Sequence, residues 1–194
     1  LKRYFFVCIL VYSHNSFAQT EWKINKSDIN EMIIEFSTNN VENYKENKTV
    51  WENEDCSIID IGDGILNIEF NSKMNTIGSG ILQGLNKAIE IGEKNFQGLI
   101  IGNEGDNFSA GADLGMIFMM SVEQEYEKLD IAIKYFQETM MKLRYSNIPT
   151  IASPHGLTLG GGCELCMLAD KVVAAAETYI GLVEFGVGLI PGGG

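Results

Sequence analysis

The chain has 194 residues, of which 45% are hydrophobic and 21% are charged, and this is enough for one globular domain with a sizeable core. The formal net charge of -12 argues against a nucleic-acid partner, because phosphate binding relies on clustered Lys and Arg. An acidic protein can still bind an anionic ligand through backbone N–H groups at turns and helix N-termini. Four cysteines are too few for a disulfide scaffold, so we expect a reducing compartment, the cytoplasm.

Residues 1–20 resemble a secretory leader. Two basic residues precede an apolar run at 4–12, and a cleavage-like site follows at 16–18. The run is too short to cross a bilayer, so we expect neither a membrane span nor export. Because the chain begins with Leu and not Met, we treat these residues as a leader-like segment of doubtful status and the sequence as a fragment.

Residues 21–50 are rich in Asn, Lys and Glu, which is typical of a linker. Within them Asp28 and Glu31 form a D-x-x-E capping pattern that predicts a short helix over 28–36. The periodic apolar patterns of a folded unit begin only after this linker. We therefore expect the folded domain to occupy residues 51–194.

The first part of this domain has the pattern of a β-hairpin followed by a helix and a strand. Two β-like runs at 57–61 and 65–70 flank a Gly-Asp-Gly turn at 62–64, which predicts the hairpin. Apolar residues recur at helical spacing over 81–89, and a short apolar run at 98–102 predicts a buried strand.

The second part continues the alternation of helices and strands. Apolar side chains recur every three or four residues over 126–143, which predicts a long amphipathic helix that ends before Pro149. A strand over 150–153, a helix near 163–168 and a strand over 171–175 are expected next. The alternation indicates an α/β fold in which most strands are parallel.

Three segments, at 107–114, 155–165 and 181–194, each combine small residues with a carboxylate. The first has no bulky side chain at 109–112, so its backbone can approach a ligand closely. The second places three glycines, 160–162, at a helix start, where unpaired N–H groups point outward. One N–H group from each segment could together hold a thioester oxygen on which negative charge develops.

Glu164 and Glu184 are the candidate acid and base. Glu164 lies in the first turn of the expected helix, and Glu184 follows after one strand and a turn. Two carboxylates in a confined site ionise unequally, because like charges raise one of the two pKa values. One group can then accept a proton while the other donates one. Taken singly, each glutamate is more often a surface residue.

These segments resemble those of the crotonase superfamily, the enoyl-CoA hydratases and isomerases, over about residues 57–194. The resemblance implies the crotonase (ClpP-like) ββα spiral fold of the α/β class. The chain stops at Gly194, inside the family's P-G-G-G segment, so we expect the domain to be C-terminally truncated. In the complete protein the resemblance implies a homo-oligomer and an acyl-CoA thioester substrate.

The resemblance also assigns roles to individual residues. It makes the N–H groups of Ala112 and Gly161 the oxyanion hole, Glu164 the residue that helps to activate water, and Glu184 the donor of the α-proton. Because family isomerases typically keep only the later glutamate, having both favours syn hydration of trans-2-enoyl-CoA. Family hydratases commonly have Pro where Val183 stands, which is a departure. The further expected substrate contacts are Lys73, Met74, Ala110, Gly111, Asp113, Leu114 and Gly160.

The sequence is most similar to the hydratase part of bifunctional 3-hydroxyacyl-CoA dehydrogenase/enoyl-CoA hydratases, as residues 51–55, 102–105 and 181–184 indicate. This resemblance implies a role in fatty-acid β-oxidation and an NAD-dependent dehydrogenase on missing upstream sequence. The chain itself has no dinucleotide signature, because Gly78-Ser79-Gly80 is followed by Gln83 where G-x-G-x-x-G needs its third glycine. We expect no cofactor in this chain beyond the CoA of the substrate.

Other chemistries have weaker support. Cys163 and Cys166 form a C-x-x-C without a second ligand pair, so two small buried residues are favoured over a redox or zinc site, and no metal is expected. A serine or cysteine hydrolase would have only His14 and His155 and lacks G-x-S-x-G, so His155 is read as a loop residue whose ring caps backbone groups. Enoyl-CoA isomerisation, 3-hydroxyacyl-CoA thioester hydrolysis and a non-catalytic CoA- or RNA-binding module remain alternatives.

Overall fold

The structure is a computed structural model that describes residues 48–193. The leader-like segment, most of the linker and the short helix expected over 28–36 lie outside the described residues. Within the described residues no helix is both long enough and apolar enough to cross a membrane.

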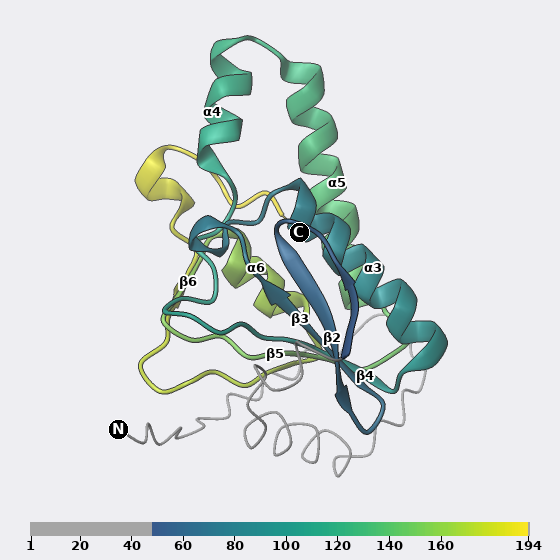
Figure 1. Cartoon of the computed structure of the whole chain (residues 1–194). Helices are drawn as coiled ribbons and strands as arrows, with labels where there is room; N and C mark the ends of the chain where they lie inside the picture. The colour runs from purple at the N-terminus through teal and green to yellow at the C-terminus, as the bar shows by residue number, and fades with distance from the viewer. Residues whose placement is uncertain (1–47, 194) are drawn as a thin grey trace.

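A six-stranded mixed sheet forms the base of the molecule (Figure 1). Its first three strands are antiparallel, and its third to sixth strands are parallel. The expected hairpin is confirmed, and Asp63 (φ 44°) and Gly64 (φ 79°) supply the positive φ angles of its tight turn. The strands, in spatial order, are β1 (Thr49–Glu52), β2 (Cys56–Gly62), β3 (Ile65–Phe70), β4 (Gly98–Ile101), β5 (Thr150–Ala152) and β7 (Lys171–Val172).

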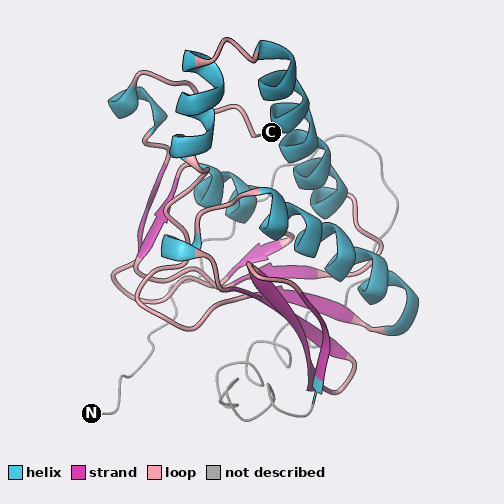
Figure 2. Ribbon diagram, turned by 45° about the horizontal axis from the view of Figure 1, so that its top comes forward, coloured by secondary structure: helices cyan, strands magenta, loops and turns pink. Residues whose placement is uncertain are grey.

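Three helices cover one face of this sheet (Figure 2). They are α3 (Ser79–Asn95), α5 (Tyr126–Arg144) and α6 (Gly161–Leu168), and the first two confirm the predicted apolar periodicities. The apolar stripe of α3 packs on β2 and β3 and is fully buried at Ile81, Leu85 and Ile89. Burying such side chains is the main favourable contribution to the stability of the domain.

The structure contains elements that the sequence patterns did not predict. Helix α4 (Leu114–Val122) is apolar all round and has no buried residue, so it lacks the one-sided pattern of an amphipathic helix. With the N-terminal half of α5 it projects away from the sheet, while the C-terminal end of α5 packs on α3 (Figures 1 and 2). A small parallel sheet joins β6 (Leu157–Leu159) to β8 (Tyr179–Gly181), and two 3₁₀ helices, η1 (Lys73–Asn75) and η2 (Glu184–Val187), are also present.

One predicted strand is shorter than expected. The pattern at 171–175 predicts five strand residues, but β7 ends at Val172. The adjacent strand β5 is followed by Pro154, which has no N–H group to donate to a sheet ladder. The bonds that remain run from Val173 N–H to Ala152 O (2.8 Å) and from Ala175 N–H to Pro154 O (2.9 Å), and the bond that Pro154 would donate between them is missing, so the regular ladder ends at Val172.

Candidate active site

The loop after β4 and the glycine-rich turn before α6 lie side by side. Ser109 in the loop donates its N–H to Leu157 O (3.0 Å) and accepts from the N–H of Leu159 (2.9 Å). Both partners belong to β6, which continues through Gly160 into α6. The fold therefore brings the first two of the predicted glycine-containing segments into direct contact.

This contact brings the amides of Ala112 and Gly161 to the same small space. A Cβ placed on Gly161 would lie 3.5 Å from Ala112 N, and a Cβ placed on Gly111 would lie 3.4 Å from Gly161 N. Gly111 has φ +96°, a conformation that favours glycine. Within residues 48–193 neither amide has a hydrogen-bond acceptor. Gly161 is also the first residue of α6, where the helix dipole adds positive potential.

Glu164 is held rigidly in the first turn of α6. Its side chain is buried, and its Oε1 accepts a hydrogen bond from the N–H of Gly193 (2.7 Å). Burial raises the pKa of Glu164, the Gly193 N–H opposes that rise, and the nearby charge of Glu184 adds to it. A carboxylate with a raised pKa is a stronger base once it is ionised.

Glu184 opens η2 and lies on the same side as Glu164. A Cβ on Gly160 would lie 3.0 Å from Glu184 Oε1, so the carboxylate rests against that glycine. Its Oε2 is buried and has no hydrogen-bond partner among the described residues. Burial raises the pKa of the neighbouring Cys163 thiol, and the charges of Glu184 and Glu164 add to that rise. Glu184 thus lies near enough to Glu164 for its charge to raise the Glu164 pKa, and its carboxylate contacts Gly160, the residue before Gly161.

Four of the expected substrate contacts also come together beside this region. Ala110 donates its N–H to Met74 O (3.1 Å), and Gly111 accepts from the N–H of Ile77 (2.8 Å). Lys73 and Met74 are exposed on η1. The loop and η1 thus form one edge of the candidate site, along which an extended ligand could lie.

Asp113 and Leu114 stand at the start of α4. The Asp113 carboxylate accepts from the N–H of Met116 (3.1 Å) and so caps the helix. Leu114 is exposed. The capping bond gives Asp113 a structural function that the sequence analysis did not foresee, beside its expected contact with the substrate.

Several hydrogen bonds that organise the site could not be foreseen from the sequence, although Asn75 lies in the segment 73–75 expected to line the CoA site. Asn75 donates its side-chain N–H to Asn107 O (3.0 Å), and Ser109 Oγ donates to Asn75 O (2.7 Å). Asn75 has φ 51°, and Asn is one of the few residues that tolerate this conformation. Gly193 was missed as the partner of Glu164, although its place in the P-G-G-G segment was a usable signal.

Two alternative sites have little support in the geometry. Cys163 and Cys166 both lie on α6, and burial raises the pKa of each thiol, which disfavours the thiolate that metals and disulfides need. Among the described residues no group of three or more His, Cys, Asp or Glu side chains is placed to hold a metal. The Nε2 of His155 lies 3.0 Å from Gly105 O, which agrees with its interpretation as a loop residue.

Comparison with known proteins identifies relatives of this chain. A Bacillus subtilis protein named "Probable 3-hydroxyacyl-CoA dehydrogenase" is 50% identical over 151 residues, which cover 77% of this chain and 19% of that protein. A Rickettsia felis protein with the provisional name "fatty acid oxidation complex trifunctional enzyme" is 37% identical over 150 residues, 77% of this chain and 21% of that protein. The chain thus spans about a fifth of the length of these curated relatives.

Solved structures give the same result for the fold. The crystal structure of an enoyl-CoA hydratase from Bacillus anthracis superposes with a TM-score of 0.65 at 28% identity, covering 72% of this chain and 55% of that one. The sequence profile described as "Enoyl-CoA hydratase/isomerase" matches residues 60–194. This chain therefore belongs to the enoyl-CoA hydratase/isomerase family and has the crotonase fold.

Proposed function

We propose that this domain hydrates trans-2-enoyl-CoA to 3-hydroxyacyl-CoA in fatty-acid β-oxidation. The observation that carries the proposal is the convergence of two unpaired amides, Ala112 and Gly161, with two carboxylates, Glu164 and Glu184. Addition of water to an enoyl thioester requires a site for developing oxyanion charge and a pair of groups that exchange protons. This region of the chain supplies both.

The two amides would stabilise the enolate. As the oxygen of water bonds to C3 of the substrate, electrons move from the C2–C3 double bond onto the thioester oxygen. The N–H groups of Ala112 and Gly161 would donate to that oxygen and bind it more strongly as its charge grows. One such donor typically contributes about 10²–10³ in rate.

The two carboxylates would move the protons. Glu164, whose pKa is raised by burial, would accept a proton from the attacking water as its oxygen bonds to C3. Glu184 would deliver a proton to C2 as the enolate collapses to the thioester. The product then contains both the hydroxyl group and the proton of one water molecule. Transfer of the proton from Glu164 back to Glu184 restores the protonation states of the two carboxyl groups.

For the complete protein we propose a bifunctional dehydrogenase/hydratase that works as a cytoplasmic homo-oligomer. The size and the name of the Bacillus subtilis relative support a second activity. The NAD site would lie outside the printed sequence. Gly78 and Gly80 begin α3 directly after η1, and a dinucleotide-binding turn would instead follow a strand. Reduction of NAD by the complete protein with 3-hydroxybutyryl-CoA would test this.

The hydratase proposal is tested with the complete protein and crotonyl-CoA. Hydration removes the ultraviolet absorbance of the conjugated thioester, so turnover is read directly. We expect Glu164→Gln and Glu184→Gln each to lower kcat by about 10³-fold or more, because each removes one proton-transfer group. Binding of the substrate, measured by calorimetry, should survive in both.

Glu127→Gln is the matched control, because Glu127 is an exposed glutamate on α5. It should turn over at the wild-type rate. Full hydratase turnover by Glu164→Gln would overturn the proposal. If that variant instead retains movement of a double bond in 3-enoyl-CoA while hydration is absent from the wild type, the domain is an isomerase.

A further inference from the structure

Ser109 occupies the contact between the two halves of the proposed oxyanion hole. Its side chain is fully buried. The hydroxyl donates to Asn75 O (2.7 Å) and accepts from the N–H of Gly111 (3.1 Å). A single hydroxyl that both donates and accepts has a fixed orientation, so it ties η1 to the residue immediately before Ala112.

The backbone of Ser109 binds the other half. Its N–H and C=O pair with Leu157 and Leu159 of β6, the strand that leads into Gly161. A Cβ placed on Gly162 would lie only 2.7 Å from Ser109 Cβ, so Ser109 also packs directly against the first turn of α6. One residue therefore contacts the elements that carry both amides.

We propose that Ser109 is a positioning residue that sets the separation and direction of the Ala112 and Gly161 N–H groups. The inference rests on the proposed function, because it takes these amides as the site of the thioester oxygen. Gly111 has no side chain and φ +96°, so hydrogen bonds restrain the two peptides that flank it. Ser109 Oγ holds the N–H of Gly111, and the N–H of Ile77 holds the C=O of Gly111, which shares its peptide with the Ala112 N–H. Without the hydroxyl, the N–H of Gly111 loses its partner, and only the hydrogen bond from Ile77 still restrains the peptide that carries the Ala112 N–H, so that amide can tilt.

Thr158 provides a matched control. It is fully buried and forms an isolated bridge with Ser109 across the same contact. Its hydroxyl, in contrast to that of Ser109, has no hydrogen-bond partner among residues 48–193. Thr158→Val therefore removes a buried hydroxyl from the same neighbourhood without breaking a hydrogen bond.

The experiment uses the complete protein and two readouts. The first is kcat and KM for hydration of crotonyl-CoA. The second is the carbonyl stretching frequency of bound hexadienoyl-CoA in Raman difference spectra, which falls as the oxyanion hole polarises the thioester. We expect Ser109→Ala to lower kcat about 10- to 100-fold with little change in KM, because small misplacements of catalytic groups have effects of this size.

In the same variant the carbonyl frequency should return part of the way to its value in solution. Thr158→Val should leave kcat and the frequency at their wild-type values. Wild-type kcat and frequency in Ser109→Ala would overturn the inference, and so would a loss of stability without a frequency change. If Ser109→Ala does not fold, Ser109→Cys decides, because it keeps a side-chain donor that is weaker and only slightly larger, and it should give an intermediate frequency.

Failure of the proposed function gives a different result. In that case the wild type itself neither hydrates crotonyl-CoA nor shifts the carbonyl frequency. If the wild type does both, and Ser109→Ala and Ser109→Cys behave like the wild type, then only the role of Ser109 is rejected and the proposed function stands.

Discussion

Helix α6 and the 3₁₀ helix η2 supply one glutamate each, but their surroundings are opposite. Six of the eight α6 residues are buried, including Glu164 itself, and Leu165 belongs to the main apolar core. No residue of η2 is buried, and Phe185 is 78% exposed. Figures 1 and 2 show η2 beside α4, which also buries no residue. The core fixes one acid, while the other stands on an open segment.

This difference indicates how the two acids are positioned. Glu164 is held in place by the packing of α6 in the core and by the hydrogen bond from the N–H of Gly193. Glu184 depends on fewer contacts, chiefly Gly160 beside its carboxylate and the turn in which Leu189 N–H donates to Glu184 O (3.0 Å). Within residues 48–193, η2 therefore holds its glutamate through fewer buried contacts than α6 does.

The contrast is tested most strongly by truncating one apolar side chain in each region. Leu165→Ala removes a fully buried side chain from α6 and should destabilise the domain by about 2–5 kcal/mol. Phe185→Ala removes an exposed side chain from η2 and should change the stability by no more than about 0.5 kcal/mol. Thermal unfolding of the 194-residue chain, in which these exposures hold, measures both. Equal losses would mean that η2 is packed as firmly as α6.

A pair of glycine substitutions tests the chemistry of the same two regions. The methyl group of Gly161→Ala would lie 2.9 Å from Phe136 Cζ and 3.5 Å from Ala112 N, so it should displace the Phe136 ring and crowd the place of the thioester oxygen between the two amides. We expect kcat to fall about 10²–10³-fold, as for the loss of an oxyanion donor. A Cβ on Gly186 of η2 meets nothing within 4 Å, so Gly186→Ala should retain the wild-type kcat. Similar rates in the two variants would place the oxygen elsewhere.

The fold was largely predictable because its buried elements carry clear periodicities. The hairpin at 57–70 and helix α3 follow from alternating and helical apolar spacing. Helix α4 does not, because Phe118, Met119 and Val122 are exposed apolar residues and no polar face marks its orientation. The three-residue strands β6 and β8 are too short to show any period. Apolar periodicity predicts helices and strands that bury one face, and α4, β6 and β8 show no such periodicity.

For the site, motif resemblance located the residues but not their backbone conformations. Gly156 and Gly161 look alike in the sequence, and Gly156→Ala would seem a mild substitution. In the structure Gly156 has φ +53°, and a Cβ there would collide with the carbonyl oxygen of Asp106. Ser109 was likewise read only as a small residue, because its hydrogen bond to Asn75 depends on a left-handed turn far away in the sequence.

The burial of Glu164 predicts a pH-dependent stability. Its pKa in the folded protein is raised, so its contribution to stability is fully present below the ordinary glutamate pKa and is lost as pH rises through the folded value. Glu164→Gln does not titrate and keeps an acceptor for Gly193 N–H. The variant should therefore unfold at a higher temperature than the wild type at neutral pH, and this advantage should disappear in acid. Melting curves across pH measure it, and a pH-independent difference contradicts it.

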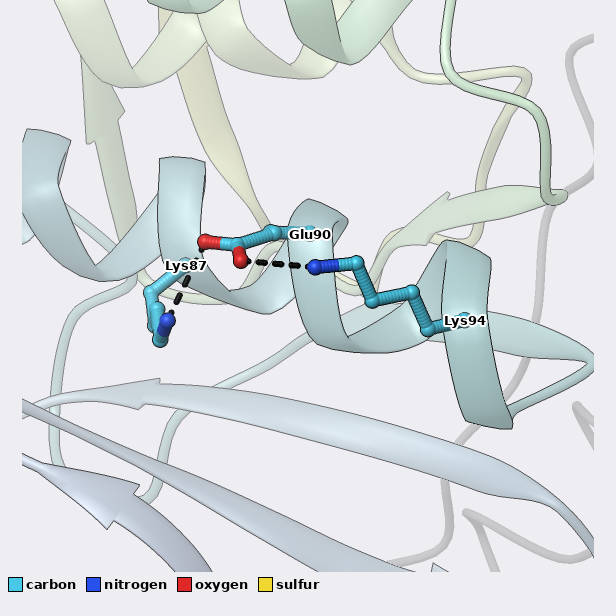
Figure 3. Close-up of polar contacts among 3 residues, drawn as sticks. All are labelled: Lys87, Glu90 and Lys94. Carbon is cyan, nitrogen blue, oxygen red and sulfur yellow. Dashed lines mark hydrogen bonds and ion pairs between the residues drawn. The ribbon is translucent and has the colours of Figure 1, made fainter.

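A third carboxylate, outside α6 and η2, is the one whose removal we expect to change the stability least. Glu90 on α3 binds Lys94 (2.9 Å) and Lys87 (3.1 Å) (Figure 3). Hydrogen bonds from Lys94 and Lys87 lower its pKa to about 2, so any stabilisation is present above the ordinary glutamate pKa and is lost only as pH falls toward 2.

All three of these side chains are substantially exposed, and water and salt screen such pairs. We therefore expect Glu90→Gln to leave the melting temperature unchanged from neutral pH to mild acid at physiological salt. The melting curves of Glu164→Gln over the same pH range are the reference for this comparison. A shift for Glu90→Gln as large as that for Glu164→Gln would mean that burial is not what distinguishes the carboxylate of α6, and the contrast between a core-held and a solvent-held acid would fail.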